Sequence, residues 1–390
     1  MSVTAPRGFR AAGVAAGLKT SGLADVCLVV NDGPDATAAG VFTANRVKAA
    51  PVLWTEQIVR GGVVRAVVLN SGGANACTGS PGFQDTHTTA EQTASSLTNS
   101  NSRLILGAGE VAVCSTGLIG ERLPMDKLLP GVRAAVRGLA RDGGLAAAEA
   151  IMTTDTRPKT TVAAGTGWTV GGMAKGAGML APAMATMLCV LTTDAVAGSE
   201  ALDTALRAAC RVTFDRLDSD GCMSTNDTVL LLASGASGIE PTQAELTAAV
   251  TAACHDLAQQ LLADAEGATK QIAIDVTEAA SEDDAVEVGR SVARNNLVKT
   301  ALFGNDPNWG RILAAVGTTT AAFEPDQLDV AINGVWVCRS GAAAEDRSKV
   351  DLSGRDVTIQ VRLNAGADAA TIWTNDLSHA YVHENSAYSS

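Results

Sequence analysis

A threonine at the junction between a flexible stretch and an apolar run offers chemistry that ordinary packing does not require. Thr186 follows Ala185 in the sequence Lys175-Gly-Ala-Gly-Met-Leu-Ala-Pro-Ala-Met-Ala-Thr-Met-Leu-Cys-Val-Leu191. A threonine with both a hydroxyl and a free α-amino group carries its own nucleophile and its own base. The junction therefore fits a chain that cuts itself before Thr186. Taken alone, the dipeptide fits better with a threonine that merely begins a strand.

Self-cleavage at this junction has a physical logic. The hydroxyl of Thr186 would attack the carbonyl of Ala185 in an N→O acyl shift, and the small alanine leaves that carbonyl approachable. Gly176, Gly178 and Pro182 allow the unusual backbone geometry that such an attack needs. The same glycines match a dinucleotide-binding fingerprint, but Pro182 interrupts the helix that this motif must open. A nucleotide-binding module is therefore disfavoured.

The elements around this junction indicate an α/β class, because strands and helices alternate along the chain. Short apolar runs predict buried strands at Val26–Val30, Val63–Leu69, Val111–Val113, Met187–Leu191, Thr228–Ala233 and Val357–Val361. Apolar residues at helical spacing predict helices at Met125–Leu139, Gly144–Met152, Ser199–Val212, Thr242–Glu266 and Glu282–Asn296. The Gly- and Thr-rich stretch Thr161–Gly178 is the best candidate for an exposed connection between two halves.

Length and composition favour a folded protein that handles small molecules. The 390 residues suggest two or three structural units, at roughly 150 residues each. A formal net charge of −12 argues against a nucleic-acid surface, which needs clustered Lys and Arg. A cut before Thr186 would give fragments of 185 and 205 residues. Because Thr186 opens an apolar run typical of a central strand, we expect the fragments to share one core.

Cysteine and histidine usage predicts no metal site. The eight cysteines form no CxxC pair and mostly lie in apolar runs, which is typical of buried reduced thiols in a cytoplasmic protein. The four histidines form no HExxH motif. The acidic segment Asp218-Ser-Asp220 lacks the spacing of a calcium loop. Neither an apolar signal segment nor an 18-residue apolar stretch is present, so we expect a soluble, cytoplasmic chain without membrane contact.

Several segments together resemble the ornithine acetyltransferase family, also called bifunctional glutamate N-acetyltransferase. The self-processing signature is matched around Thr186, and further matches follow in the family's order along the chain. They are Cys114-Ser-Thr-Gly-Leu-Ile-Gly120, Ile151-Met-Thr-Thr-Asp-Thr-Arg-Pro-Lys159, Asp264-Ala-Glu-Gly-Ala-Thr-Lys270, Phe303-Gly-Asn-Asp-Pro-Asn-Trp-Gly-Arg311 and Glu384-Asn-Ser-Ala-Tyr-Ser-Ser390.

The resemblance implies a self-cleaved, two-fragment architecture like that of N-terminal-nucleophile enzymes, with its own topology. Residues 1–185 would form an α fragment with the oxyanion hole and a substrate loop, and residues 186–390 a β fragment that carries the nucleophile. Thr186 would be that nucleophile, while Thr116 and Gly117 would donate hydrogen bonds to the tetrahedral oxyanion. The substrate-binding residues implied are Thr153, Lys175, Thr186, Glu266, Asn385 and Ser390.

Two of these residues also carry independent chemical arguments. Lys175 lies in an otherwise uncharged stretch, where a cation suits a substrate carboxylate. Glu266 is predicted to end a helix, where its charge opposes the macrodipole, and a residue placed against its local preference suits an ammonium group. Asn385 and Ser390 belong to a tail that would ordinarily fray. The resemblance instead implies that the tail folds back over the site.

The reaction implied is acetyl transfer from N2-acetylornithine to glutamate through an acetyl-threonine, in arginine biosynthesis, without metal or organic cofactor. Paired fragments in an α2β2 or higher assembly are implied as well. The residues leave open whether acetyl-CoA serves as a second acetyl donor. A related self-processing aminopeptidase or amidohydrolase, with water as acceptor, explains Thr186 but not the matched substrate segments.

Overall fold

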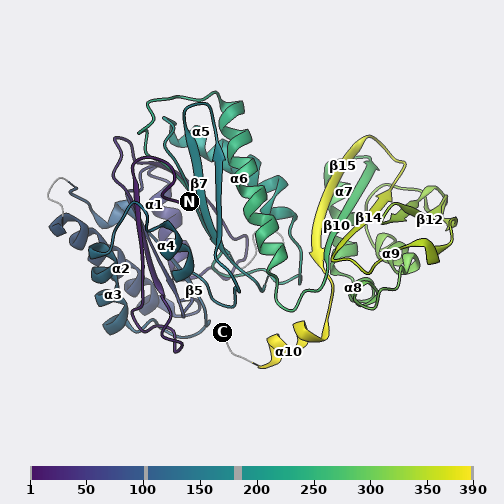
Figure 1. The fold of residues 1–390 in the computed structure, drawn as a ribbon, viewed down its shortest axis with the longest axis horizontal. Helices are drawn as coiled ribbons and strands as arrows, with labels where there is room; N and C mark the ends of the chain where they lie inside the picture. Colours follow the sequence, from purple (N-terminus) through teal and green to yellow (C-terminus); the bar gives the residue numbers. More distant parts are fainter. Residues whose placement is uncertain (1, 101–103, 180–186, 388–390) are drawn as a thin grey trace.

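The computed structural model describes residues 2–100, 104–179 and 187–387. Figure 1 shows two lobes, a larger one that holds most of the chain up to α6 and a smaller one built around β10, β14 and β15. Within the described ranges no helix is both long enough and apolar enough to cross a bilayer.

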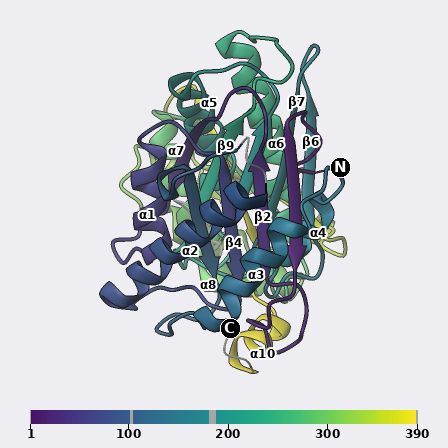
Figure 2. The same ribbon diagram turned by 90° about the vertical axis from the view of Figure 1, so that its left-hand side faces the viewer.

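The larger lobe begins with a four-stranded sheet in the order β1-β2-β4-β5, in which only β4 and β5 run parallel. One face of this sheet packs against α2 and α3, which lie across it in Figure 2. The strands are β1 Phe9–Val14, β2 Val26–Asn31, β4 Ala66–Ser71 and β5 Val111–Thr116, and the helices are α2 Gly79–Ser100 and α3 Met125–Arg137. The helices α1 Ala50–Val59 and α4 Gly144–Ala150 complete this half.

A second, five-stranded sheet packs on the other face of the first one. Its order is β3-β9-β8-β7-β6, with β8 and β9 parallel and the other pairs antiparallel. Side chains of both sheets share one apolar cluster between them, and α5 and α6 cover the outer face. Its elements are β3 Thr37–Phe42, β6 Lys159–Ala164, β7 Thr169–Lys175, β8 Leu188–Thr193, β9 Thr228–Ala233, α5 Ser199–Val212 and α6 Gln243–Ala263. The lobe is therefore a helix–sheet–sheet–helix sandwich, which confirms the α/β class.

The smaller lobe has its own core, in which a six-stranded sheet packs against α7 and its neighbours. The sheet order is β13-β12-β11-β14-β10-β15. The elements are β10 Gln271–Ala279, α7 Glu282–Arg294, α8 Asn296–Phe303, α9 Trp309–Val316, β11 Asp329–Ile332, β12 Val335–Arg339, β13 Ala342–Ala343, β14 Asp356–Arg362 and β15 Asp368–Asn375. Helix α10 (His379–Ala387) then returns toward the larger lobe (Figure 1). Short 3-10 helices lie at Ala108–Glu110, Phe214–Arg216, Pro325–Gln327 and Arg347–Lys349.

The prediction of an exposed connection over Thr161–Gly178 is wrong. This stretch supplies most of the β6–β7 hairpin, and β7 is buried along almost its whole length. Its glycines serve close packing instead of flexibility. A Cβ on Gly171 would lie 2.3 Å from the backbone oxygen of Ser2, and one on Gly172 would lie 2.7 Å from Leu191.

The predicted end of the helix at Glu266 is also wrong, because α6 ends at Ala263. Asp264 caps the helix, and its carboxylate accepts hydrogen bonds from Thr156 and Lys159 on a distant segment. These contacts turn the chain away from the helical path. Glu266 therefore lies in the loop that follows the helix, and the macrodipole argument for it does not apply.

The predicted division at residues 185 and 186 does not follow the two lobes. In the five-stranded sheet, β3, β6 and β7 come from the first 185 residues, while β8 and β9 come from the rest. Strand β8 pairs with β7 on one side and with β9 on the other. Segments from both sides of the predicted cut thus form one sheet and one core, as the sequence predicts.

Candidate active site

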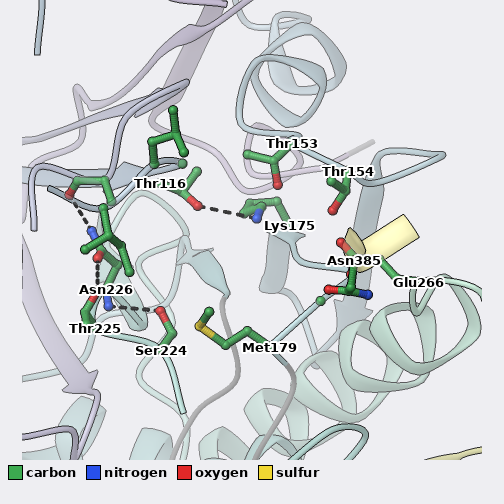
Figure 3. Close-up of a pocket in the computed structure, with 15 residues that line it drawn as sticks. Thr116, Thr153, Thr154, Lys175, Met179, Ser224, Thr225, Asn226, Glu266 and Asn385 are labelled. Carbon is green, nitrogen blue, oxygen red and sulfur yellow. Dashed lines mark hydrogen bonds between the residues drawn. The ribbon is translucent and has the colours of Figure 1, made fainter. Parts of the chain in front are cut away.

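A cavity of about 360 Å³ opens where the ends of the two sheets meet the returning tail. Its walls come from Ala74, Thr116, Gly117, Leu118, Ile119, Thr153, Thr154, Lys175, Gly178, Met179, Ser224, Thr225, Asn226, Glu266 and Asn385. Six of the predicted site residues are among them, although they come from separate parts of the sequence. Figure 3 shows Lys175 pointing toward Thr116 and Glu266 lying beside Asn385.

The predicted oxyanion donors lie where β5 ends. The carbonyl of Thr116 accepts hydrogen bonds from the backbone of Gly72 and Gly73, both at 3.0 Å. Gly117 has a φ of +130°, and a Cβ there would lie 2.5 Å from the nitrogen of Gly73. Only glycine fits this turn. Lys175 Nζ donates to the Thr116 hydroxyl oxygen at 3.4 Å, which leaves the hydroxyl hydrogen available as a donor in the cavity.

The carboxylate of Asp155 holds in place two backbone segments that contribute to the cavity wall. It accepts hydrogen bonds from the backbone of Thr153 at 3.0 Å and of Gly176 at 2.6 Å. It also forms a buried ion pair with Lys159, whose Nζ contacts Asp264 as well, at 2.6 Å in each case. Burial alone would raise the pKa of Asp155, but the ammonium groups of Lys175 and Lys159 outweigh it and hold the pKa at about 2.

Lys175 is a buried ammonium group on the cavity wall. The residue is 1% exposed, and within the described part of the chain it forms no ion pair at contact distance. Burial lowers its pKa, against the opposing effects of the more distant Asp155, Asp227 and Glu266. A buried cation in this position interacts strongly with a ligand carboxylate, because little water screens the pair.

Glu266 and the C-terminal tail form the opposite wall. The backbone of Glu266 donates to Ala177 at 2.9 Å, and its carboxylate packs so closely on Gly178 that a Cβ there would lie 2.4 Å from Oε2. Ser378 donates to the carbonyl of Gly267 at 2.5 Å and so fixes the start of the tail beside Glu266. Asn385 on α10 reaches the cavity from there. The tail thus folds back over the cavity, as the resemblance implies.

Sequence reasoning missed the polar residues that precede β9. Ser224, Thr225 and Asn226 line the cavity and are nearly completely buried. Their signal was available, because a polar run immediately precedes a strand that is otherwise apolar. Met179 was missed as well. It has a φ of +58°, and its backbone donates to Asp220 at 2.7 Å.

Three predicted site residues lie outside the described part of the structure: Ala185, Thr186 and Ser390. The described chain resumes at Met187, which is 1% exposed. Its backbone nitrogen donates to Asp227 Oδ1 at 3.0 Å, and its carbonyl accepts from Thr228 at 3.2 Å. The residue that follows the predicted nucleophile is therefore held at the start of β8, the central strand of the second sheet.

Comparison with known proteins identifies the family. Residues 10–390 match the sequence profile of the ArgJ family. The chain belongs to the ArgJ family. This confirms the resemblance that the sequence motifs indicate.

Curated members of the ArgJ family are similar over their whole length. The arginine biosynthesis bifunctional protein ArgJ of Streptomyces avermitilis is 68% identical over 390 residues, and that of Streptomyces coelicolor is 66% identical over 390 residues. The alignments cover 100% of this chain and 100% of each relative. A solved chain of ornithine acetyltransferase complexed with ornithine, from Mycobacterium tuberculosis, is 61% identical, with a TM-score of 0.45. That alignment covers 48% of this chain and 96% of the solved chain.

Proposed function

We propose that this ArgJ-family acetyltransferase moves an acetyl group from N2-acetyl-L-ornithine to L-glutamate in arginine biosynthesis. The observation that carries the proposal is the convergence of Thr116, Gly117, Lys175 and Glu266 on one cavity in a chain of this family. These residues supply oxyanion donors, a cation and an anion, which are the groups that an acetylated diamino acid requires.

The reaction proceeds by double displacement. The hydroxyl of Thr186 attacks the acetyl carbonyl while its free α-amino group takes the hydroxyl proton. The Thr116 hydroxyl and the Gly117 backbone N–H donate to the oxyanion, and one such donor typically contributes about 2.7–4 kcal/mol of barrier lowering. Collapse breaks the amide bond, the proton passes to the leaving nitrogen, and ornithine departs. The amino group of glutamate then attacks the acetyl-threonine ester and restores the free hydroxyl.

The charges on the cavity wall match the substrates. Both amino acids carry an α-carboxylate, which the Lys175 ammonium binds. Ornithine also carries a side-chain ammonium group, which suits Glu266 on the opposite wall, next to Asn385. Thr153 and Ser390 complete the proposed set of substrate contacts. The chemistry needs no metal or organic cofactor.

In the self-cleavage between Ala185 and Thr186, the N→O acyl shift frees the α-amino group, and water then hydrolyses the Ala185–Thr186 ester to a carboxylate and the free hydroxyl. The products, residues 1–185 and 186–390, stay together as α and β fragments and pair into an α2β2 or higher assembly. We place the protein in the cytoplasm, with small molecules as its partners and no nucleic acid or membrane.

Denaturing electrophoresis with N-terminal sequencing tests the cleavage. We expect two bands of similar mass, the second beginning with Thr186. Thr186→Ala should remain one inactive band, whereas Thr186→Ser should cleave slowly because the hydroxyl survives. A single full-length band from fully active protein would contradict the mechanism.

Acetyl transfer is tested with purified protein, N2-acetylornithine and glutamate. Formation of N-acetylglutamate in amounts equal to the ornithine released supports transfer. Acetate in place of N-acetylglutamate would favour the water-dependent amidohydrolase instead.

We also propose acetyl-CoA as a second acetyl donor, since the two Streptomyces relatives are named bifunctional. The test is incubation with glutamate and acetyl-CoA in the absence of acetylornithine. A lack of N-acetylglutamate under these conditions would leave a monofunctional enzyme.

A further inference from the structure

Two adjacent residues in front of β9 join the two segments on which the proposed reaction depends. Asn226 and Asp227 directly precede β9 and are 4% and 0% exposed. One contacts the oxyanion segment at the end of β5, and the other contacts the segment that begins at Met187. Neither belongs to a motif that the sequence resemblance picked out.

Asn226 fixes the end of β5. Its Nδ2 donates to the carbonyl of Ser115 at 2.8 Å and to that of Ala74 at 2.7 Å, so both amide hydrogens are used. Its Oδ1 accepts from the Thr225 hydroxyl at 2.6 Å. Because Ser115 directly precedes Thr116, the Asn226 side chain determines where the oxyanion donors lie relative to β9.

Asp227 fixes the start of the nucleophile segment. Its Oδ1 accepts the backbone N–H of Met187 at 3.0 Å. Its Oδ2 is buried and has no hydrogen-bond partner among the described residues. A carboxyl group kept in such surroundings costs stability, which is typical of groups retained for function. Burial raises the pKa of Asp227 well above its usual range, against the opposing effects of the Met187 amide, Ser224 and Lys175.

We propose that Asn226 and Asp227 are a positioning pair that sets the distance between the oxyanion donors on β5 and Met187, the residue that follows the proposed nucleophile in the sequence. The pair has no flexible element in it, because the two residues are consecutive and both are anchored to backbone groups. A displacement of about 1 Å in such a site can cost about 10²-fold in rate. This inference rests on the proposed function, in which Thr186 is the nucleophile.

Asn226→Asp tests the first contact, because it replaces the donating amide by an oxygen that faces two carbonyls at unchanged size. Asn31 provides a matched control. It is also a fully buried asparagine that joins the two sheets, since its Nδ2 donates to Ala233 at 3.0 Å, but Ala233 is at the other end of β9. Asn31→Asp therefore imposes the same chemical change away from the cavity.

We expect Asn226→Asp to lower kcat by about 10²-fold, counted per cleaved molecule, with KM for acetylornithine changed less than about threefold. Asn31→Asp should lower the melting temperature by a similar amount but keep kcat within about threefold of wild type. Equal kcat losses in the two variants would overturn the inference, since they would show a merely structural effect. An unchanged kcat in Asn226→Asp would overturn it as well.

Asp227 gives an independent test that does not depend on folding of the Asn226 variant. Asp227→Asn keeps the size of the side chain and an oxygen that accepts from Met187. It should keep kcat within about tenfold, whereas Asp227→Ala, which lacks the acceptor, should lose about 10²-fold. Equal losses in both variants would overturn the positioning role. Absence of transfer in the wild-type protein would instead refute the proposed function.

Discussion

The buried carboxylate of Asp155 gives the sharpest test of how the site is held together. Asp155→Asn keeps the size and shape of the side chain but removes its charge. Among the described residues, Lys159 then retains only Asp264 as an ion-pair partner, and Lys175 loses the carboxylate that most strongly offsets its burial. The change therefore leaves two buried ammonium groups, those of Lys159 and Lys175, with the Asp264 carboxylate in contact with Lys159.

The magnitude follows from the pKa and from burial. The fall in the pKa of Asp155 from 3.8 to about 2 corresponds to about 2.5 kcal/mol of stabilisation of the charged form. Breaking a buried pair adds the cost of the uncompensated partner, so we expect a loss of about 3–5 kcal/mol in the free energy of unfolding. Because the folded-state pKa is lowered, this stabilisation is present above pH 3.8 and is lost as the pH falls through about 2.

The assay is urea unfolding in a Thr186→Ala background, where the chain is expected to stay in one piece. Asp203→Asn is the matched control, because Asp203 forms an exposed i,i+4 pair with Arg207 on α5, with side chains 42% and 62% exposed. That control should cost less than about 0.5 kcal/mol. A loss at Asp155 below about 1 kcal/mol, or no larger than at Asp203, would refute the reasoning.

The remaining predictions concern the cavity itself. Gly117→Ala should lower kcat/KM by at least about 100-fold, while Gly120→Ala, also at positive φ but with open space around its Cβ, should not; similar losses would contradict the steric argument. Gly178→Ala should raise the KM for acetylornithine about tenfold, or about 1.4 kcal/mol, by displacing Glu266, and kinetics at fixed glutamate check this. Because burial lowers the pKa of Lys175, carboxylate binding should weaken as the pH rises through a value below 10.5. The KM of the wild type should therefore rise with pH in this range, and the rise should be absent in Lys175→Met.

The sequence predicts the elements that have continuous apolar runs or a clear apolar face. Strand β9 and helix α5 have the predicted bounds, because the apolar residues of each follow the strand or helix pattern without interruption. Helix α2 was not predicted, because its buried face consists mostly of threonines and alanines instead of large apolar residues. Thr86, Thr89 and Thr93 are among them. The β6–β7 hairpin was not predicted because its Gly- and Thr-rich stretch indicated an exposed connection, whereas its glycines make room for neighbouring segments.

The candidate site was predictable where its residues belong to recognisable motifs, and less so where they act through contacts across the fold. Thr116, Lys175 and Glu266 come from three motifs, and the structure brings them together at one cavity. Asn226 and Asp227 become recognisable only in the folded structure, because their partners, Ser115 on β5 of the first sheet and Met187 beside β8 of the second, are distant in the sequence. No periodicity carries that information.

The central position of β8 in the second sheet has a consequence for how the protein folds and unfolds before and after the proposed cleavage. The predicted fragments interlock through β7, β8 and β9, so separating them means unfolding the sheet. We therefore expect the chain to fold first as one polypeptide and the proposed cut before Thr186 to follow. After cleavage, refolding requires the association of two fragments, so it depends on their concentration. We expect the lifetime of the cleaved enzyme to be set by a slow rate of unfolding, and the unfolding to be irreversible.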